Sequence, residues 1–160
     1  MKEITLQTQI TACTVDELDA ELRQLVEIAK QKTQDAYCPY SHFHVGAAVL
    51  LADGQIVTGA NQENAAYPSG LCAERTTLFA ANANHPQTPV VALALACYTN
   101  GHFTKDVTSP CGACRQVMLE TEKRFGTPIK VILYSEAGCY VFDSAADLLP
   151  LSFAANNLEG

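Results

Sequence analysis

The chain has 160 residues, 48% of them hydrophobic, which is enough for one domain (residues 1–160) with a sizeable core. Its 10 basic and 17 acidic residues give a net charge of -7, which disfavours binding to nucleic acid. No apolar run approaches the roughly 20 residues of a membrane span. The odd count of seven cysteines and the lack of a signal-peptide core in residues 1–20 predict a reduced, cytoplasmic protein.

The first predicted element is a helix over residues 15–32. Thr14 and Glu17 have the spacing of a capping box, which marks a helix start. Apolar residues then recur at helical spacing, at Leu18, Leu22, Val26 and Ala29.

A β-hairpin is predicted next. Residues 43–51 are rich in Val, Ala and Leu, and Asp53-Gly54 is a hairpin signal before a second strand over residues 55–59. Gly46 in the first strand would let another element pack closely against it.

The remaining elements alternate between helix and strand. Residues 72–84 have an Ala-rich helical composition that ends before Pro86, and residues 90–97 read as a strand buried on both faces, commonly a parallel one. The rest of the chain predicts a helix, a strand, a turn at Gly138, a strand and a short helix, over residues 111–123, 128–134, 140–142 and 145–149. This order predicts a layered α/β domain with a mixed sheet.

Three cysteines are candidate zinc ligands. Cys72 and Cys111 each begin a predicted helix, where unpaired backbone N–H groups favour the thiolate that zinc requires. Cys114 lies one helical turn after Cys111, so both thiols can face one ion. Three protein ligands leave one position of a tetrahedral zinc free for water, which is typical of a catalytic site.

Two charged neighbours complete the candidate site. Glu74 follows Cys72 by two residues and is the candidate general base for a zinc-activated water. Three thiolates and one Zn²⁺ carry a net charge of -1, and Arg75 is positioned to offset that charge by hydrogen bonding to a thiolate.

Other interpretations of the cysteines remain open at this point. A lone C-x-x-C pair more often belongs to a structural zinc site or a redox motif. A structural site would recruit a fourth ligand, for which Cys97, Cys139, His85 and His102 are available on spacing alone. The joint occurrence of C-A-E-R and P-C-G-A-C favours catalysis, because together they form a signature of zinc deaminases.

The chain resembles the cytidine deaminase family, specifically its homotetrameric, three-cysteine nucleoside deaminases. The similarity extends over residues 36–158. It is carried by both zinc fragments and by the segments at residues 37–41, 43–48, 61–68 and 148–153. Related deaminases usually have histidine where this chain has Cys72.

The resemblance implies a three-layer α/β/α fold with a mixed sheet of about five strands and one Zn²⁺ per chain. It implies hydrolytic deamination of cytidine and deoxycytidine, in pyrimidine salvage, by a cytoplasmic enzyme that acts on the C–N bond of a cyclic amidine. Glu74 would carry every proton transfer. The substrate-binding residues implied are Phe43, Asn61, Glu63, Ala65, Tyr67, Ala73 and Phe153.

Each of these residues has a role in the implied pocket. Phe43 would pack on the pyrimidine ring, Asn61 and Glu63 would hydrogen-bond the ribose, and the Ala73 backbone would help to read the base edge. The remaining three, Ala65, Tyr67 and Phe153, would contribute to sites shared between the subunits of a homotetramer.

One position departs from the family pattern, because His44 stands where proline is common and leaves the strand entry less constrained. We expect His44 at a surface or lip position. Four cysteines are interpreted as buried apolar side chains or free thiols, namely Cys13, Cys38, Cys97 and Cys139. Two alternative functions are a blasticidin-type antibiotic deaminase and a zinc-stabilised nucleoside-binding protein without turnover.

Overall fold

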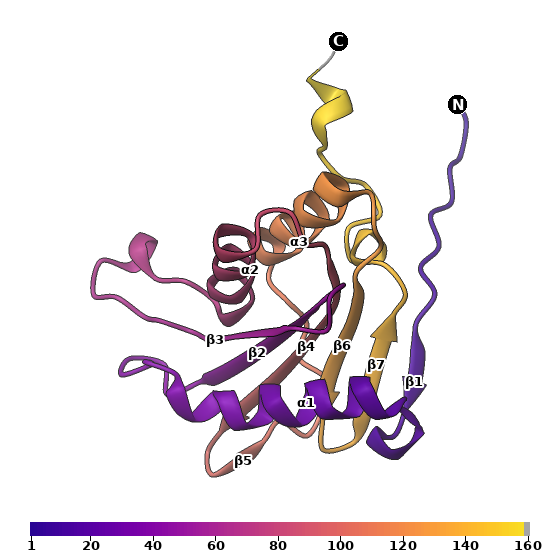
Figure 1. The fold of residues 1–160 in the computed structure, drawn as a ribbon. Helices are drawn as coiled ribbons and strands as arrows, with labels where there is room; N and C mark the ends of the chain where they lie inside the picture. Colours follow the sequence, from indigo (N-terminus) through magenta and orange to yellow (C-terminus); the bar gives the residue numbers. More distant parts are fainter. Residues whose placement is uncertain (159–160) are drawn as a thin grey trace.

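The computed structural model describes residues 1–158 and folds them into a mixed β-sheet with helices on both faces (Figure 1). The helices and strands, in chain order, are β1 (Thr11–Cys13), α1 (Ala20–Lys32), β2 (His44–Leu51), β3 (Ile56–Ala60), α2 (Ala73–Asn84), β4 (Val90–Thr99), β5 (His102–Phe103), α3 (Gly112–Phe125), β6 (Lys130–Ser135) and β7 (Gly138–Phe142). The predicted three-layer α/β/α class is confirmed.

The sheet has the strand order β1-β7-β6-β4-β2-β3, with β5 paired to the end of β4. The predicted hairpin is the antiparallel pair β2 and β3. Strand β4 is parallel to β6, as its apolar run indicated, and antiparallel to β2. The predicted count of about five strands was too low, because the described chain has seven. The two extra strands, β1 and β5, contain only three and two residues and have no readable periodicity.

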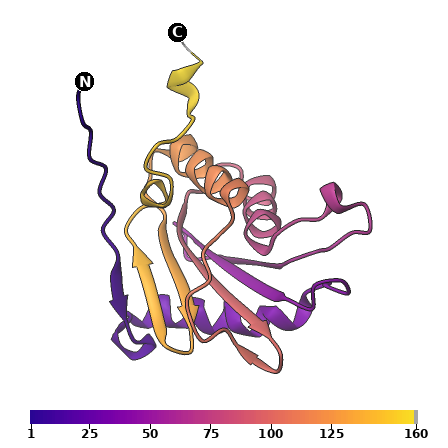
Figure 2. The same cartoon turned by 180° about the vertical axis from the view of Figure 1, so that it is seen from behind.

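Alternate residues of the central strands face two separate cores. Ala47 and Val49 of β2 belong to the core under α2 and α3. Ala48 and Leu50, one residue out of phase, pack in the core under α1. Figure 2, seen from behind, shows α1 on the opposite side of the sheet from the other two helices. A central strand buried on both faces explains the continuous apolar run that predicted β4.

Helix α1 begins later than predicted. The capping box is present, since Thr14 N donates to the Glu17 carboxylate at 2.7 Å, but it closes a single 3₁₀ turn, Val15–Glu17. Leu18 then takes extended dihedral angles, and the α-helix begins at Ala20. The capping box therefore belongs to the turn before the helix and not to the helix itself.

Gly46 makes the close contact expected of it. A Cβ atom at this position would lie 2.2 Å from the carbonyl oxygen of Ala29 and 2.6 Å from Thr33 N, so the C-terminal end of α1 packs directly on the β2 backbone. Gly138, predicted as a turn residue, is the first residue of β7 and has a φ of 133°.

The two ends of the described chain project from the same end of the molecule in both views (Figures 1 and 2). None of the described helices has the length and apolar character needed to cross a bilayer.

Candidate active site

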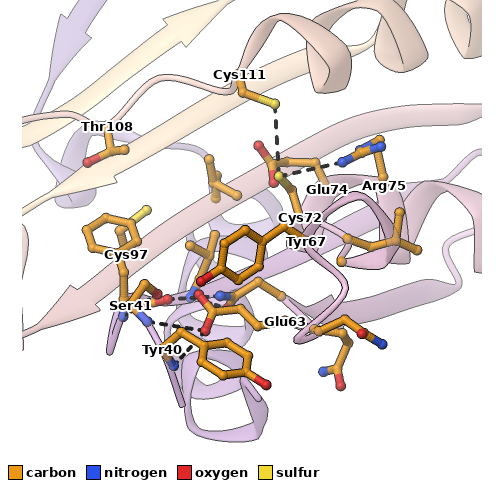
Figure 3. Close-up of a pocket in the computed structure, with 18 of the residues that line it drawn as sticks. Tyr40, Ser41, Glu63, Tyr67, Cys72, Glu74, Arg75, Cys97, Thr108 and Cys111 are labelled. Carbon is orange, nitrogen blue, oxygen red and sulfur yellow. Dashed lines mark hydrogen bonds between the residues drawn. The ribbon is translucent and has the colours of Figure 1, made fainter. Parts of the chain in front are cut away.

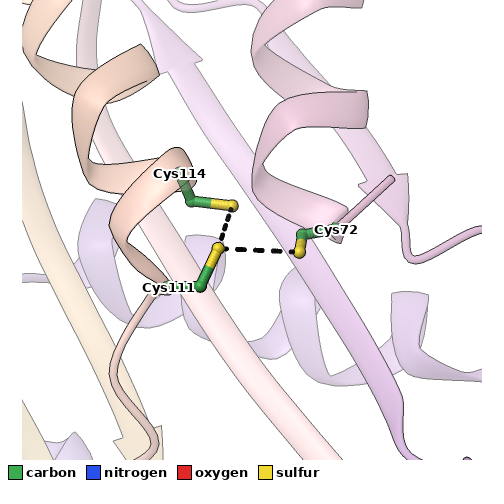
Figure 4. A group of neighbouring side chains, drawn as sticks. All are labelled: Cys72, Cys111 and Cys114. Carbon is green, nitrogen blue, oxygen red and sulfur yellow. Dashed lines mark hydrogen bonds between the residues drawn. The ribbon is translucent and has the colours of Figure 1, made fainter. Parts of the chain in front are cut away.

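The first turns of α2 and α3 lie side by side and carry the three candidate ligands (Figure 4). Cys72 is the N-cap residue of α2, and Cys111 is the N-cap residue of α3. Cys114 follows within the first turn of α3 and is buried. Both helix starts agree with the predicted ones, so the thiols lie at the positive ends of two helix dipoles.

The sulfur atoms lie at separations close to those of a tetrahedral zinc site. Cys111 Sγ lies 3.9 Å from Cys72 Sγ and 3.4 Å from Cys114 Sγ, and all three atoms lie within 4.8 Å of one another. Zinc–sulfur bonds of about 2.3 Å in a tetrahedron place two sulfurs about 3.8 Å apart. Within residues 1–158, no fourth Cys, His, Asp or Glu joins the cluster, and this excludes the four candidates considered from spacing.

The pKa values of Cys72 and Cys114 are shifted in opposite directions, and the Arg75 guanidinium lies beside Cys72. Hydrogen bonding with Cys114 and with Arg75 lowers the pKa of Cys72, although burial acts in the opposite direction. The hydrogen bond with Cys72 and burial both raise the pKa of Cys114. Arg75 Nη2 lies 4.0 Å from Cys72 Sγ, and Arg75 Nε is buried without a hydrogen-bond partner in the described chain. A guanidinium in this place compensates the negative charge of a trithiolate site.

Glu74 lies in the first turn of α2, beside the thiol cluster (Figure 3). Only 4% of its surface is exposed, yet it lines the cavity described next. Burial raises the pKa of Glu74 to about 7. A carboxyl group with a raised pKa at the inner end of a cavity is suited to moving protons near neutral pH.

A cavity of about 560 Å³ leads from the surface to Cys72, Cys111 and Glu74. This volume is typical of a pocket for a small organic ligand. The cavity brings together four of the residues assigned to substrate binding by resemblance, namely Phe43, Asn61, Glu63 and Tyr67. It is also lined by residues to which the sequence assigned no role in binding, including Tyr40, Ser41, Leu95, Cys97 and Thr108.

The other three residues assigned to substrate binding do not line this cavity. Ala73 is fully buried in the first turn of α2, and Ala65 is exposed. Phe153 lies in the C-terminal segment and is 59% exposed, and its carbonyl oxygen accepts a hydrogen bond from Gln116 Nε2 at 2.9 Å.

Glu63 and Asn61 both bind the backbone of the segment that carries Phe43. Glu63 Oε2 accepts hydrogen bonds from Tyr40 N at 3.0 Å and Ser41 N at 3.2 Å. The side chain and backbone of Ser41, with the backbone of Tyr40, lower the pKa of Glu63, so it stays a carboxylate. Asn61 contacts the next residues of the same segment, through Val45 N and the Phe43 carbonyl.

His44 begins β2 and is half-buried, with its ring 6.2 Å from the ring of Tyr98 in an edge-to-face contact. It does not line the cavity. Of the four cysteines given no catalytic role, three are buried and Cys13 is half-buried, and all four are free thiols. Burial raises the pKa of each of these thiols.

Comparisons with known proteins agree with this geometry. The family model for the cytidine and deoxycytidylate deaminase zinc-binding region matches residues 19–126. The cytidine deaminase of Halalkalibacterium halodurans is 41% identical over 137 residues, which cover 86% of this chain and 97% of that protein.

Solved structures give the same result. The 1.6 Å crystal structure of cytidine deaminase from Burkholderia pseudomallei is 42% identical, with a TM-score of 0.69 over 81% of this chain and 97% of the other. The crystal structure of cytidine deaminase from Mycobacterium tuberculosis is 34% identical, with a TM-score of 0.66 over 85% of this chain and 99% of the other.

Proposed function

Since this chain belongs to the cytidine and deoxycytidylate deaminase family, we propose that it removes the 4-amino group of cytidine and deoxycytidine by zinc-dependent hydrolysis. The products are uridine or deoxyuridine and ammonia, which places the enzyme in pyrimidine salvage. The observation that carries this proposal is a cluster of three thiols beside a buried carboxyl group that lines a cavity with the volume of a nucleoside pocket.

Cys72, Cys111 and Cys114 would hold one Zn²⁺ per chain, because their sulfur separations match a tetrahedral ion with a fourth position left for solvent. Bound zinc supplies a water of lowered pKa at that position. The thiols require a reducing environment, and all seven cysteines are free, which supports a cytoplasmic location.

Glu74 performs the proton transfers. Its carboxyl group lies next to the thiol cluster and inside the cavity, so it faces both the water and the base. It accepts the proton of the attacking water and passes it to N3 of the pyrimidine. It then carries the proton of the new C4 hydroxyl to the amino group, so that the C4–N bond breaks, ammonia leaves and the C4 carbonyl forms. A pKa raised by burial favours a group that must both accept and return a proton.

The cavity walls orient the nucleoside. Phe43 provides an apolar face for the pyrimidine ring. Ala73 is fully buried and outside the cavity lining, so it would offer only its backbone to the base edge. Glu63 already uses Oε2 for two backbone N–H groups, while Oε1 makes no hydrogen bond to the described chain, so Oε1 is available to a ribose hydroxyl. The Asn61 amide is bonded to the backbone of Val45 and Phe43, so the ribose contact is assigned to Glu63.

A homotetramer with sites shared between subunits would explain why three of the assigned substrate-binding residues are exposed in the isolated chain. Tyr67 is 79% exposed at the mouth of the cavity, and Phe153 and Ala65 lie on the surface of the isolated chain. Association of subunits would cover these side chains and bring Phe153 to a neighbouring cavity.

Cytidine turnover by the purified protein tests this function. The absorbance change on loss of the 4-amino group, together with ammonia release, should be observed with cytidine and deoxycytidine in protein that contains about one zinc per chain. Faster turnover of a blasticidin-type antibiotic would indicate the alternative substrate class. A zinc-loaded protein that binds nucleoside without releasing ammonia would indicate a binding protein.

A further inference from the structure

We propose that Asn61 is a positioning residue, whose side-chain amide holds Phe43 in the orientation in which its ring packs on the pyrimidine. The inference rests on the function proposed above and adds a role that differs from a contact with the sugar. It follows from the hydrogen bonds at the end of the β2–β3 pair.

Strand β3 leaves β2 just before the cavity. Gly46 and Ala60 form the last residue pair between the two strands. Beyond this point only the Asn61 N–H still bonds β2, while the Asn61 carbonyl accepts from Tyr37 N and the Gln62 backbone pairs with Leu71. The Val45 N–H and the Phe43 carbonyl would therefore face this side of the sheet without a backbone partner.

The Asn61 side chain takes the place of that missing strand. Its Oδ1 accepts from Val45 N at 2.8 Å, and its Nδ2 donates to the Phe43 carbonyl oxygen at 2.9 Å. A primary amide offers the same donor and acceptor as a peptide group, so one side chain continues the ladder by one residue pair. The backbone N–H of Asn61 adds a third bond, to the Val45 carbonyl at 3.1 Å.

Asn61 is well placed to transmit this constraint, because only 9% of its surface is exposed. Buried backbone groups that lose their partners move to find new ones. Phe43 immediately precedes β2 and lines the cavity, so any such movement changes the surface offered to the base. His44 lies between the two anchored residues and lacks the fixed φ of proline, which makes the amide more important here.

A mutant cycle between Asn61 and Phe43 tests the proposal. We expect N61A to lower kcat/KM for cytidine about tenfold in the wild-type background. In the F43A background the same change should cost less than about twofold, because the ring that Asn61 positions is already absent. If the loss of kcat/KM in the double variant equals the product of the losses in N61A and F43A, the proposal is wrong.

A second comparison separates positioning from a direct sugar contact. N61A should lower kcat/KM by the same factor for cytidine and for 3′-deoxycytidine, which lacks the 3′-hydroxyl. N61D should lose at least as much activity as N61A, because its carboxylate sets an acceptor against the Phe43 carbonyl. Retained activity in N61D, or a loss with cytidine alone, would assign Asn61 to the sugar and contradict the inference.

Zinc content and thermal unfolding establish that each variant is folded, and N61S replaces N61A if the alanine variant does not fold. N84A is the matched control, because Asn84 is an exposed asparagine at the end of α2 and does not line the cavity. Its kcat/KM should equal that of the wild type. Wild-type protein without cytidine turnover would refute the proposed function itself, whereas active wild type with multiplicative losses would refute only the role of Asn61.

Discussion

Cys72 and Cys111 occupy equivalent positions at the N-termini of two different helices, and their sulfur atoms lie 3.9 Å apart. They are 39 positions apart in the chain, so the fold alone creates this pair. The mixed sheet brings the first turns of α2 and α3 together, and each helix presents its N-cap thiol to the same point. The account of zinc binding and catalysis depends on this relationship.

Substitution of Cys111 by serine should remove the zinc. A hydroxyl is a far poorer zinc ligand than a thiolate, and the two remaining thiolates are too few protein ligands to hold the ion. Metal analysis of C111S after dialysis should give less than about a tenth of the wild-type zinc, with turnover lost in parallel. Cys13 lies outside the cluster, so C13S should keep its zinc; full zinc in C111S would exclude Cys111 as a ligand.

Substitution of Glu74 by glutamine should separate binding from chemistry. The amide keeps the size of the side chain but cannot accept the proton, so kcat should fall by about 10²-fold to 10⁴-fold. KM and zinc content should change little, because Glu74 is not among the three ligands. E120Q, an exposed position on α3, is the control. Turnover by E74Q within about threefold of wild type would exclude Glu74 as the proton carrier.

Arg75 should contribute through the charge of the thiolates. Its Nη2 lies 4.0 Å from Cys72 Sγ, so R75A leaves more negative charge on the sulfurs and weakens activation of the water. Loss of such a partner typically costs about 10-fold to 100-fold in activity or metal affinity. R124A is the control, since Arg124 binds the Pro86 carbonyl away from the site. Equal kinetics and zinc affinity in R75A and wild type would refute this role.

Gly46 should be the glycine at which a methyl group is most destabilising. In G46A the new Cβ would overlap the Ala29 carbonyl and Thr33 N, both backbone atoms that cannot rotate away. We expect unfolding free energy to fall by about 3 kcal/mol. At Gly112 a new methyl group would meet no neighbouring atom of the described chain within 4 Å, so G112A should change stability by less than about 1 kcal/mol. Similar urea midpoints for G46A and G112A would contradict this prediction, because they would mean that α1 shifts to accommodate the methyl group at little cost in stability.

The parts of the fold that were predicted well have long, regular patterns. Helices α2 and α3 and strand β4 have both periodicity and clear end signals, and the structure places them within two residues of the expected bounds. Strand β5 has two residues and no pattern of its own. The capping box at Thr14 predicted the start of α1 at residue 15, which was wrong: it closes a 3₁₀ turn, Leu18 is extended, and α1 begins at Ala20.

The candidate site likewise has one part that local sequence patterns predict and another that only the fold brings together. The spacing of Cys111 and Cys114, and of Cys72 and Glu74, is local, so the chain itself indicates the cluster. Thr108 and Leu95 reach the cavity because the end of β4 and the approach to α3 lie beside it, which no short motif encodes. The hydrogen bonds that tie Asn61 to Phe43 and Val45 depend on where β3 leaves the sheet, and this requires the three-dimensional structure.

Parallel assays of zinc and turnover on one preparation test the central claim most directly. Purified protein should contain about one zinc per chain and convert cytidine to uridine with release of one ammonia, and a chelator that removes the zinc should abolish the conversion until zinc is restored. Zinc-loaded protein that leaves cytidine unchanged, or full turnover by metal-free protein, would contradict the account.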